Sequence, residues 1–183
     1  SKKPIIYRAT QQWFISMETN NLKEIALKSI EKTLWVPSIS KNRIKSMVKD
    51  RPDWCVSRQR VWGVPITVFL DNNTGEILRD PEVVERIAQV VEKKGADAWF
   101  TEDPQIILGD KYNSDQYECV QDILDVWFDS GSTHSFVLNS EKQKWPADLY
   151  LEGSDQHRGW FQSSLLESCG TRGRAPFDAV LTH

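Results

Sequence analysis

Acidic and amide side chains follow directly on a short apolar run near the end of this chain, and their types suit nucleotide binding. The run ends at Leu151, and the residues after it are Glu152, Gly153, Ser154, Asp155 and Gln156. Trp160 and Phe161 then begin an apolar pattern with helical spacing. Carboxylates accept hydrogen bonds, and the start of a helix offers free backbone N–H groups. A strand that leads through such residues into a helix therefore favours a nucleotide site.

The elements that must position these residues form a predicted βαβ unit. Residues 148–151 are predicted to form a short buried strand, followed by a helix that stops at Gly170, and 179–181 form a second strand ending at Thr182 and His183. Because such crossovers are right-handed, the two strands should be parallel. The residues after both strands then share the carboxyl edge, where open parallel sheets bind ligands. Geometry alone decides nothing, because every βαβ unit has polar residues at its strand ends.

Composition indicates one folded domain, or one domain with a small insertion. The chain has 183 residues, 39% of them apolar, and eight tryptophans, which is enough core material. Cys55, Cys119 and Cys169 are far apart, so neither a disulfide framework nor a metal site is predicted. No apolar run approaches the ~20 residues of a membrane span, and no signal-like segment opens the chain. We therefore expect a cytoplasmic protein with no membrane contact.

Charge is distributed unevenly along the chain. Residues 1–70 carry 13 Lys and Arg against 5 Asp and Glu, a net charge of +8. Residues 71–130 carry 5 basic and 15 acidic residues, a net charge of −10. The basic first part fits contact with a phosphate backbone, but for charge alone a solvated helix surface is the favoured interpretation.

Apolar spacing predicts helices and strands in the rest of the chain. Residues 13–15 are expected to be extended, residues 22–30 helical, and a further helix should follow Ser40 and end at Arg51-Pro52. A β-hairpin is predicted for 64–78, and residues 123–128 show a buried-strand pattern.

The clearest helix signals surround residues 80–94. Asp80 suits the N-cap, Pro81 the first helical position and Gly95 the exit. The acidic surroundings of this helix, up to about Asp122, resemble a peripheral insertion more than a ligand site.

Three phrases together resemble the isoleucyl-tRNA synthetases of class I, of bacterial type. They are Asp-Trp-Cys-Val-Ser-Arg-Gln-Arg-Val-Trp-Gly at 53–63, Asp-Val-Trp-Phe-Asp-Ser-Gly-Ser at 125–132, and Leu-Glu-Gly-Ser-Asp-Gln-His-Arg-Gly-Trp-Phe at 151–161. The first two also resemble the valyl and leucyl enzymes. The match covers nearly the whole chain and places it after the family's editing insertion. The family's His-Ile-Gly-His and Lys-Met-Ser-Lys-Ser motifs do not occur in these residues, so the resemblance implies no catalytic residue here and an inactive fragment.

The resemblance implies a site for isoleucyl-adenylate, made from isoleucine and ATP with Mg²⁺ before transfer to tRNA(Ile). The residues implied to bind the adenylate are Glu152, Gly153, Asp155, Gln156 and His183. For Asp155, a helix N-cap is an equally weighted alternative. The resemblance also implies that Trp127 and Trp160 form the walls of the isoleucine pocket with Gln156 at its edge. Tryptophans are otherwise more often core residues.

Other candidate residues keep two interpretations. Arg58 and Arg60 lie in the family's Ser-Arg-Gln-Arg phrase, near where the tRNA acceptor end enters, but bridging loop carbonyls is at least as plausible a role. His157 can be an ordinary first-turn helix residue and His134 a surface histidine. Neither has a partner nearby in the sequence for a metal, and neither is assigned a role.

The predicted fold is the second half of a Rossmann-type parallel-sheet catalytic domain with a small mixed α/β insertion. The predicted division is a catalytic segment at 1–63, the insertion at 64–122 and the adenylate-binding half at 123–183. The remaining domains of the same polypeptide are expected partners. The alternative is a non-catalytic module that binds nucleotide or RNA through its basic segment.

Overall fold

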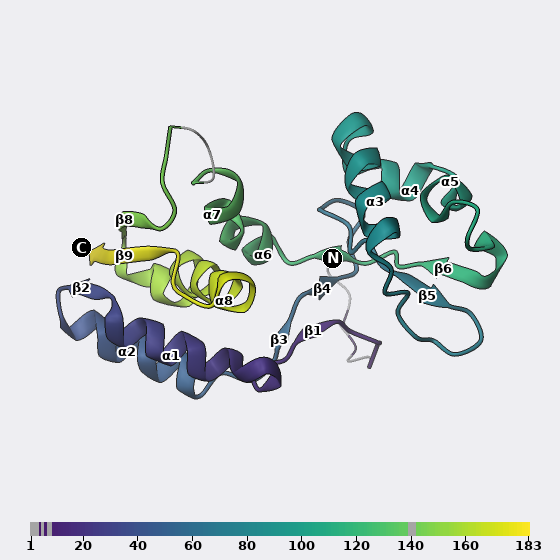
Figure 1. Ribbon diagram of the computed structural model, residues 1–183. Coiled ribbons are helices and arrows are strands. Elements are labelled where there is room, and N and C mark those ends of the chain that lie inside the picture. Colours follow the sequence, from purple (N-terminus) through teal and green to yellow (C-terminus); the bar gives the residue numbers. More distant parts are fainter. Residues whose placement is uncertain (1–3, 5, 7–8, 139–141) are drawn as a thin grey trace. The chain divides into compact units, whose positions relative to one another are not determined.

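The structure is a computed structural model that describes residue 4, residue 6, residues 9–138 and residues 142–183. The chain folds into two compact units. Unit 1 contains residues 1–56 and 130–183, and unit 2 contains residues 57–129 (Figure 1).

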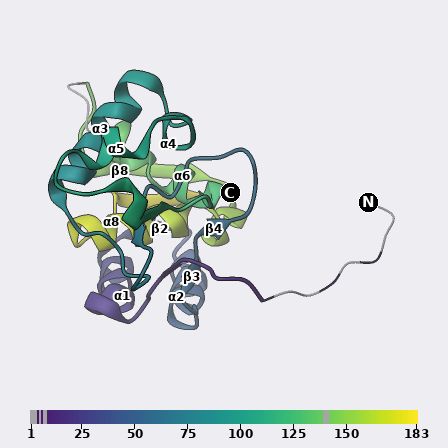
Figure 2. The same cartoon turned by 90° about the vertical axis from the view of Figure 1, so that its right-hand side faces the viewer.

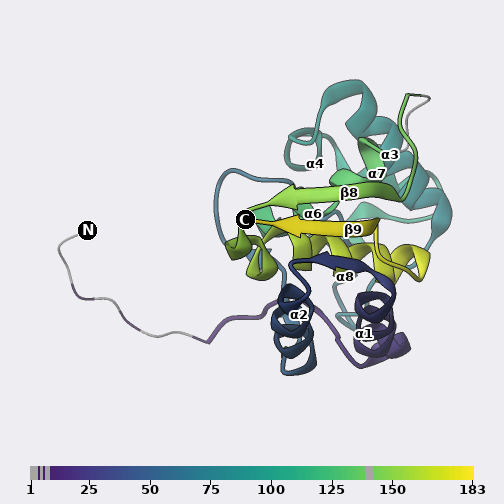
Figure 3. The same ribbon diagram turned by 90° about the vertical axis from the view of Figure 1, so that its left-hand side faces the viewer.

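A three-stranded parallel sheet forms the centre of unit 1. Strand β9 (Phe177–Thr182) lies between β2 (Leu34–Val36) and β8 (Ala147–Glu152). Figure 3 shows the three arrows side by side and pointing the same way. The prediction that the strand at 148–151 and the strand at 179–181 are parallel is confirmed. Their carboxyl ends therefore lie at one edge of the sheet.

The two faces of this sheet differ in burial. Trp35, Tyr150 and Val180 are buried on the face covered by α8. The side chains of the opposite face lie in two cross-strand rows, Leu34–Ala179–Leu149 and Val36–Leu181–Leu151. Of these, Leu34, Val36, Leu149 and Leu151 are exposed. The prediction of a short buried strand at 148–151 is therefore wrong for Leu149 and Leu151, because β8 is an edge strand of the described sheet and only one of its faces is covered.

Helices pack on the covered face. They are α1 (Leu22–Lys32), α2 (Ile39–Lys49), the short α7 (Thr133–Phe136) and α8 (Trp160–Arg172), with 3-10 turns η1 (Thr19–Asn21) and η3 (Ser154–Arg158). Figure 2 shows α1 and α2 side by side. Helix α8 is buried along residues 161–169, so it is the core helix of the unit. It continues past Gly170, where the sequence predicted its end, to a cap at Gly173 with φ +73°.

Unit 1 also contains a short antiparallel pair, β1 (Phe14–Ile15) with β3 (Trp54–Cys55). This pair confirms the predicted extended segment at 13–15. The backbone N–H of Met17 donates to the Asp53 carboxylate at 2.8 Å, which ties the two strands to the chain just before α1.

Unit 2 is a small mixed α/β body. Its strands form two antiparallel pairs, β4 (Ser57–Arg58) with β7 (Ile123–Leu124) and β5 (Phe69–Asp71) with β6 (Tyr117–Cys119). Its helical segments are α3 (Pro81–Lys94), α4 (Ala98–Thr101), α5 (Pro104–Leu108) and η2 (Ser114–Gln116). Its core consists of Phe69, Val83, Ile87, Trp99, Ile107 and Leu108.

The hairpin predicted at 64–78 forms only in part. A turn closes through the Gly75 N–H and the Asp71 carbonyl at 2.8 Å, and Leu70 and Ile77 form an isolated bridge. The main partner of β5 is β6, about fifty residues later. Local turn chemistry predicted the reversal, but it could not predict the pairing of Phe69 with Cys119, which lies fifty residues away in the chain.

The strand predicted for 123–128 is also shorter than expected. Only β7 is extended, and residues 126–131 form helix α6 (Val126–Gly131). The Asp125 carboxylate accepts a hydrogen bond from the Trp127 N–H at 3.2 Å, as an N-cap does. Val126 and Trp127 are 68% and 44% exposed, so the apolar run does not mark a buried strand.

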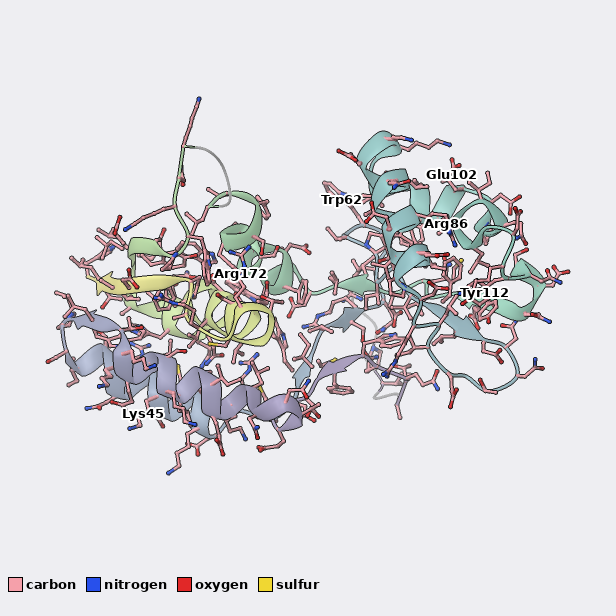
Figure 4. All side chains as sticks on the ribbon, viewed as in Figure 1. Lys45, Trp62, Arg86, Glu102, Tyr112 and Arg172 are labelled. Carbon is pink, nitrogen blue, oxygen red and sulfur yellow. The ribbon has the colours of Figure 1, made fainter. Side chains whose placement is uncertain are left out.

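Two polar networks hold α3 in unit 2. Asp80 accepts from the Glu82 N–H, from Lys111 and from the Tyr112 hydroxyl, at 2.9, 2.6 and 2.7 Å. Arg86 donates to the carbonyls of Ile107 and Leu108 at 2.7 and 2.6 Å, and Figure 4 shows it between α3 and α5. The predicted helix at 80–94, with its Asp80 cap and Gly95 exit, is confirmed.

We expect Asp80 to make the stability of unit 2 sensitive to acid. Lys111 first, then Tyr112 and the Glu82 N–H, lower the pKa of Asp80 below its ordinary value of about 3.9. A depressed folded-state pKa stabilises the fold above the unfolded-state pKa, and this contribution is lost as pH falls. The melting temperature should fall below about pH 4, and less steeply in Asp80→Asn. Parallel pH profiles for the two proteins, from thermal denaturation between pH 7 and 2, would contradict this.

Among the residues that the structure describes, no helix is long and apolar enough to cross a membrane.

Candidate functional site

The predicted adenylate-binding residues lie at the carboxyl edge of the parallel sheet. Glu152 is the last residue of β8, and it pairs in register with Thr182 at the end of β9. His183 follows directly and is exposed, as Glu152 is. The structure therefore brings together the two strand ends that the sequence assigned to one edge, and it leaves both side chains accessible.

A close backbone turn follows Glu152. A Cβ atom on Gly153 would lie 2.7 Å from the Asp155 carboxylate, so a larger residue at this position would displace the Asp155 side chain. The Asp155 carboxylate accepts from the side-chain amide of Gln156 at 2.9 Å, and the side-chain oxygen Oε1 of Gln156 accepts from the backbone N–H of Trp160 at 3.0 Å. These bonds order the loop between β8 and α8.

The N-cap alternative for Asp155 is wrong. Its carboxylate makes no capping hydrogen bond to η3 or to α8, whose N-cap positions are Gly153 and Gly159. Asp155 is exposed, and its oxygens face the loop and solvent. Because the Asp155 carboxylate does not cap a helix, it remains accessible to a ligand.

Trp160 begins α8 and is only half-buried. Its indole N–H lies 3.0 Å from the Ser130 carbonyl and 3.0 Å from the Thr133 hydroxyl. Its ring is stacked on Tyr150, with the centroids 4.2 Å apart and 4° between the planes. Trp160 also lines a groove of about 430 Å³ beside the free edge of β8, together with Thr133, Leu149, Tyr150 and Leu151. It is therefore not an ordinary core residue.

Trp127 belongs to unit 2, where it lies in the first turn of α6 and is 44% exposed. The Asp125 carboxylate caps the start of α6 by accepting from the backbone N–H of Trp127. The Asp125 side chain is 9% exposed and forms an ion pair with Arg58 at 2.8 Å. Arg58 also donates to the Ser57 carbonyl at 2.7 Å. Arg60 donates to the Gln59 carbonyl at 3.0 Å. Both arginines thus contact loop carbonyls, as their structural interpretation predicted, and the tRNA contact stays a prediction.

The structure corrects the interpretation of His134. It is 1% exposed, so it is not a surface histidine. Its Nδ1 lies 2.9 Å from the Gly131 carbonyl, and because a carbonyl only accepts, Nδ1 carries the proton. Burial lowers the pKa of His134. The sequence suggested a surface position because it contains no sign that α7 packs against α8.

His157 lies in the 3-10 turn η3 and is fully buried. Its Nδ1 contacts the Ser154 carbonyl at 2.6 Å, and its ring packs edge-on against Phe161. The histidine is therefore a structural residue of the loop that carries Asp155 and Gln156.

Sequence reasoning missed Thr133 and Tyr150, the two side chains that hold Trp160. Tyr150 was treated as one residue of a buried strand, and Thr133 follows the recognised Asp-Ser-Gly-Ser phrase without a signal of its own. Tyr150 is 10 positions and Thr133 is 27 positions before Trp160 in the chain, so a local sequence pattern cannot predict these contacts.

Within the described ranges, no three His, Cys, Asp or Glu side chains lie together in a way that would hold a metal ion.

Comparison with known proteins identifies relatives over the whole chain. The chain is 59% identical to the isoleucine–tRNA ligase of Pelagibacter ubique, 57% to that of Zymomonas mobilis and 56% to that of Gluconobacter oxydans. Each alignment covers 100% of this chain but only 19 to 20% of the relative. The chain thus spans about a fifth of the length of these curated relatives. A family model described as tRNA synthetases class I (I, L, M and V) matches residues 2–183, and the chain belongs to this family.

Proposed function

We propose that this chain is part of an isoleucine–tRNA ligase, which activates isoleucine with ATP and transfers it to tRNA(Ile). The observation that carries the proposal is that Glu152 and His183 lie at the same edge of the sheet, since Glu152 pairs with Thr182. All of this chain aligns with such ligases. We expect the activity only in the complete polypeptide and an inactive fragment.

We propose that the loop after β8 binds the aminoacyl-adenylate. Glu152 and Asp155 offer carboxylates to the substrate ammonium and to ribose hydroxyls, since both are exposed and a carboxylate only accepts. Gly153 keeps the backbone close to the ligand, Gln156 contributes its amide, and His183 approaches from the end of β9.

We propose that Trp127 and Trp160 line the isoleucine side chain, with Gln156 at the edge of the pocket. Both indoles are partly exposed, and a side chain that lines a ligand pocket must be accessible before the ligand binds. An apolar pocket gains only about 1–3 kcal/mol from one methylene, and the handling of valine by isoleucine ligases is the standard example of this limit.

For tRNA, we propose that Arg58 and Arg60 lie near the path of the acceptor end. Both are accessible, with the Arg58 side chain 42% exposed and Arg60 exposed. The net charge of +8 in residues 1–70 supports an approach of nucleic acid to this part of the chain.

For the fold, we propose a Rossmann-type sheet completed by the rest of the polypeptide. Parallel sheets are covered on both faces, whereas Leu34, Val36, Leu149 and Leu151 are exposed here. The free edge of β8 offers unpaired backbone groups to a further strand. The four-fifths of the relatives' length outside this chain provides the material for both.

ATP is a substrate of the proposed reaction, and we propose that Mg²⁺ accompanies its phosphates. Among the described residues, no three His, Cys, Asp or Glu side chains lie together as metal ligands, so we propose no contact between these residues and Mg²⁺. The proposed reaction belongs to protein synthesis in the cytoplasm.

Isoleucine-dependent exchange of pyrophosphate into ATP by the full-length protein tests the proposal. We expect exchange with isoleucine that exceeds exchange with leucine at equal concentration. Binding of ATP or RNA without amino-acid-dependent exchange would overturn it and favour the non-catalytic binding module.

A further inference from the structure

Three groups hold the indole of Trp160 in place. Its N–H is shared between the Ser130 carbonyl and the Thr133 hydroxyl, each at 3.0 Å, and the Tyr150 ring stacks against its face. A tryptophan at the start of a helix has several rotamers available. Two directed hydrogen bonds and a parallel stack select one of them.

The Thr133 hydroxyl has a defined orientation. It has one proton, which it donates to the Ser130 carbonyl at 2.9 Å. Its lone pairs therefore remain to accept from the indole. The bonds form a closed set in which each donor has an acceptor, so rotation of the indole would break two contacts at once.

The turn that carries Thr133 is itself fixed against α8. The buried His134 donates to the Gly131 carbonyl at 2.9 Å. A Cβ on Gly131 would fall 2.2 Å from a Glu167 carboxylate oxygen and 3.0 Å from the carbonyl carbon of Ser163. The turn and α8 are thus in close contact, and a shift of one would displace the other.

Tyr150 is equally constrained. It is 5% exposed, and its hydroxyl lies 3.2 Å from the Ser164 hydroxyl, one turn along α8 from Trp160. The ring therefore cannot follow the indole if the indole moves.

We propose that Thr133 and Tyr150 are positioning residues that set the Trp160 indole and thereby determine how well isoleucine fits its pocket. The inference rests on the proposed function, in which Trp160 forms a wall of that pocket. Neither residue needs to touch the substrate. A small displacement of a pocket wall weakens binding of the side chain that it contacts and leaves ATP unaffected.

The test uses pyrophosphate exchange by the full-length protein, with KM measured separately for isoleucine and for ATP. Thr133→Val removes the hydroxyl at nearly constant shape, and we expect the KM for isoleucine to rise about 2- to 10-fold with the KM for ATP unchanged. Thr133→Ser keeps the hydroxyl and should restore the wild-type value. Thr101→Val is the matched control, because Thr101 is exposed on α4 and its hydroxyl contacts only a local carbonyl, that of Asp97.

Tyr150 provides a second, independent arm. Tyr150→Leu removes the stack but leaves the hydrogen bonds of the indole, and it should also raise the KM for isoleucine alone. Tyr150→Phe keeps the stack and removes only the hydroxyl contact with Ser164, so it should raise the KM for isoleucine less than Tyr150→Leu does. This arm keeps the inference testable if Thr133→Val does not fold.

Trp160→Ala separates the two proposals. If it raises the KM for isoleucine while Thr133→Val and Tyr150→Leu do not, or if these two raise both KM values equally, the positioning inference is wrong and the proposed pocket stands. If Trp160→Ala leaves the KM for isoleucine unchanged, the pocket assignment and the positioning inference fall together.

Discussion

Replacing Glu152 by Ala in the full-length protein should reduce isoleucine-dependent pyrophosphate exchange roughly 10- to 150-fold. The expectation follows from one lost hydrogen bond to a charged group, about 1.5–3 kcal/mol, with each 1.36 kcal/mol changing a rate tenfold. Glu152 ends β8 and is exposed, with one carboxylate oxygen 3.3 Å from the Gly153 N–H. Its carboxylate is therefore available to a ligand and contributes little to folding.

Two variants sharpen this prediction. Glu152→Gln keeps the size and removes the charge, and it should lose activity nearly as strongly if the ammonium or a ribose hydroxyl needs a carboxylate. Glu92→Ala is the matched control, because Glu92 is exposed on α3 of unit 2. Melting temperatures should stay close to wild type in all three. Unchanged exchange in Glu152→Ala would remove this residue from the site.

The largest effect on stability is expected for Trp99→Ala in unit 2. Trp99 is 2% exposed, packs edge-on against Phe69 with centroids 4.9 Å apart, and donates from its indole to the Val120 carbonyl at 2.8 Å. Truncation of a buried tryptophan costs about 3–5 kcal/mol through lost transfer energy and the cavity that remains. The Val120 carbonyl would also lose its partner.

Trp62→Ala is the control for this variant. Trp62 lies in the same unit (Figure 4). Its side chain is 89% exposed, so its removal should change stability by less than about 0.5 kcal/mol. Hydrogen exchange of the full-length protein, followed in peptides from α3 and β5, reports the stability of this unit directly. Equal protection in the two variants would show that the core around Trp99 does not hold unit 2 together.

Local sequence signals predicted the elements whose stabilising groups are neighbours in the chain. Helix α3 is the clearest case, since its cap, its first-turn proline and its terminal glycine all lie within two residues of its ends. The parallel βαβ unit followed from element lengths and the handedness of crossovers. The motifs at 53–63, 125–132 and 151–161 were sufficient to indicate the family, which the match over residues 2–183 confirms.

Long-range packing decided the features that the sequence misassigned. An apolar run does not show whether other segments cover both faces of the strand that it forms. The sequence therefore predicted that β8 is buried, whereas Leu149 and Leu151 are exposed. The run at 123–128 is helical after Asp125, whose carboxylate accepts from the backbone N–H of Trp127 at the start of α6, although Val, Trp and Phe favour strands. A surface position was the interpretation offered for His134, but it is buried because α7 packs against α8, which lies far along the chain.

The sequence by itself thus determined the family, the main helices, the parallel pair and the chemical types present at its carboxyl edge. Only the tertiary structure decided which face of the sheet is covered and which groups orient Trp160. The physical reason is range. Propensity and capping act over a few residues, whereas the stack of Tyr150 on Trp160 and the bond from the indole to Thr133 exist only after distant segments have packed together.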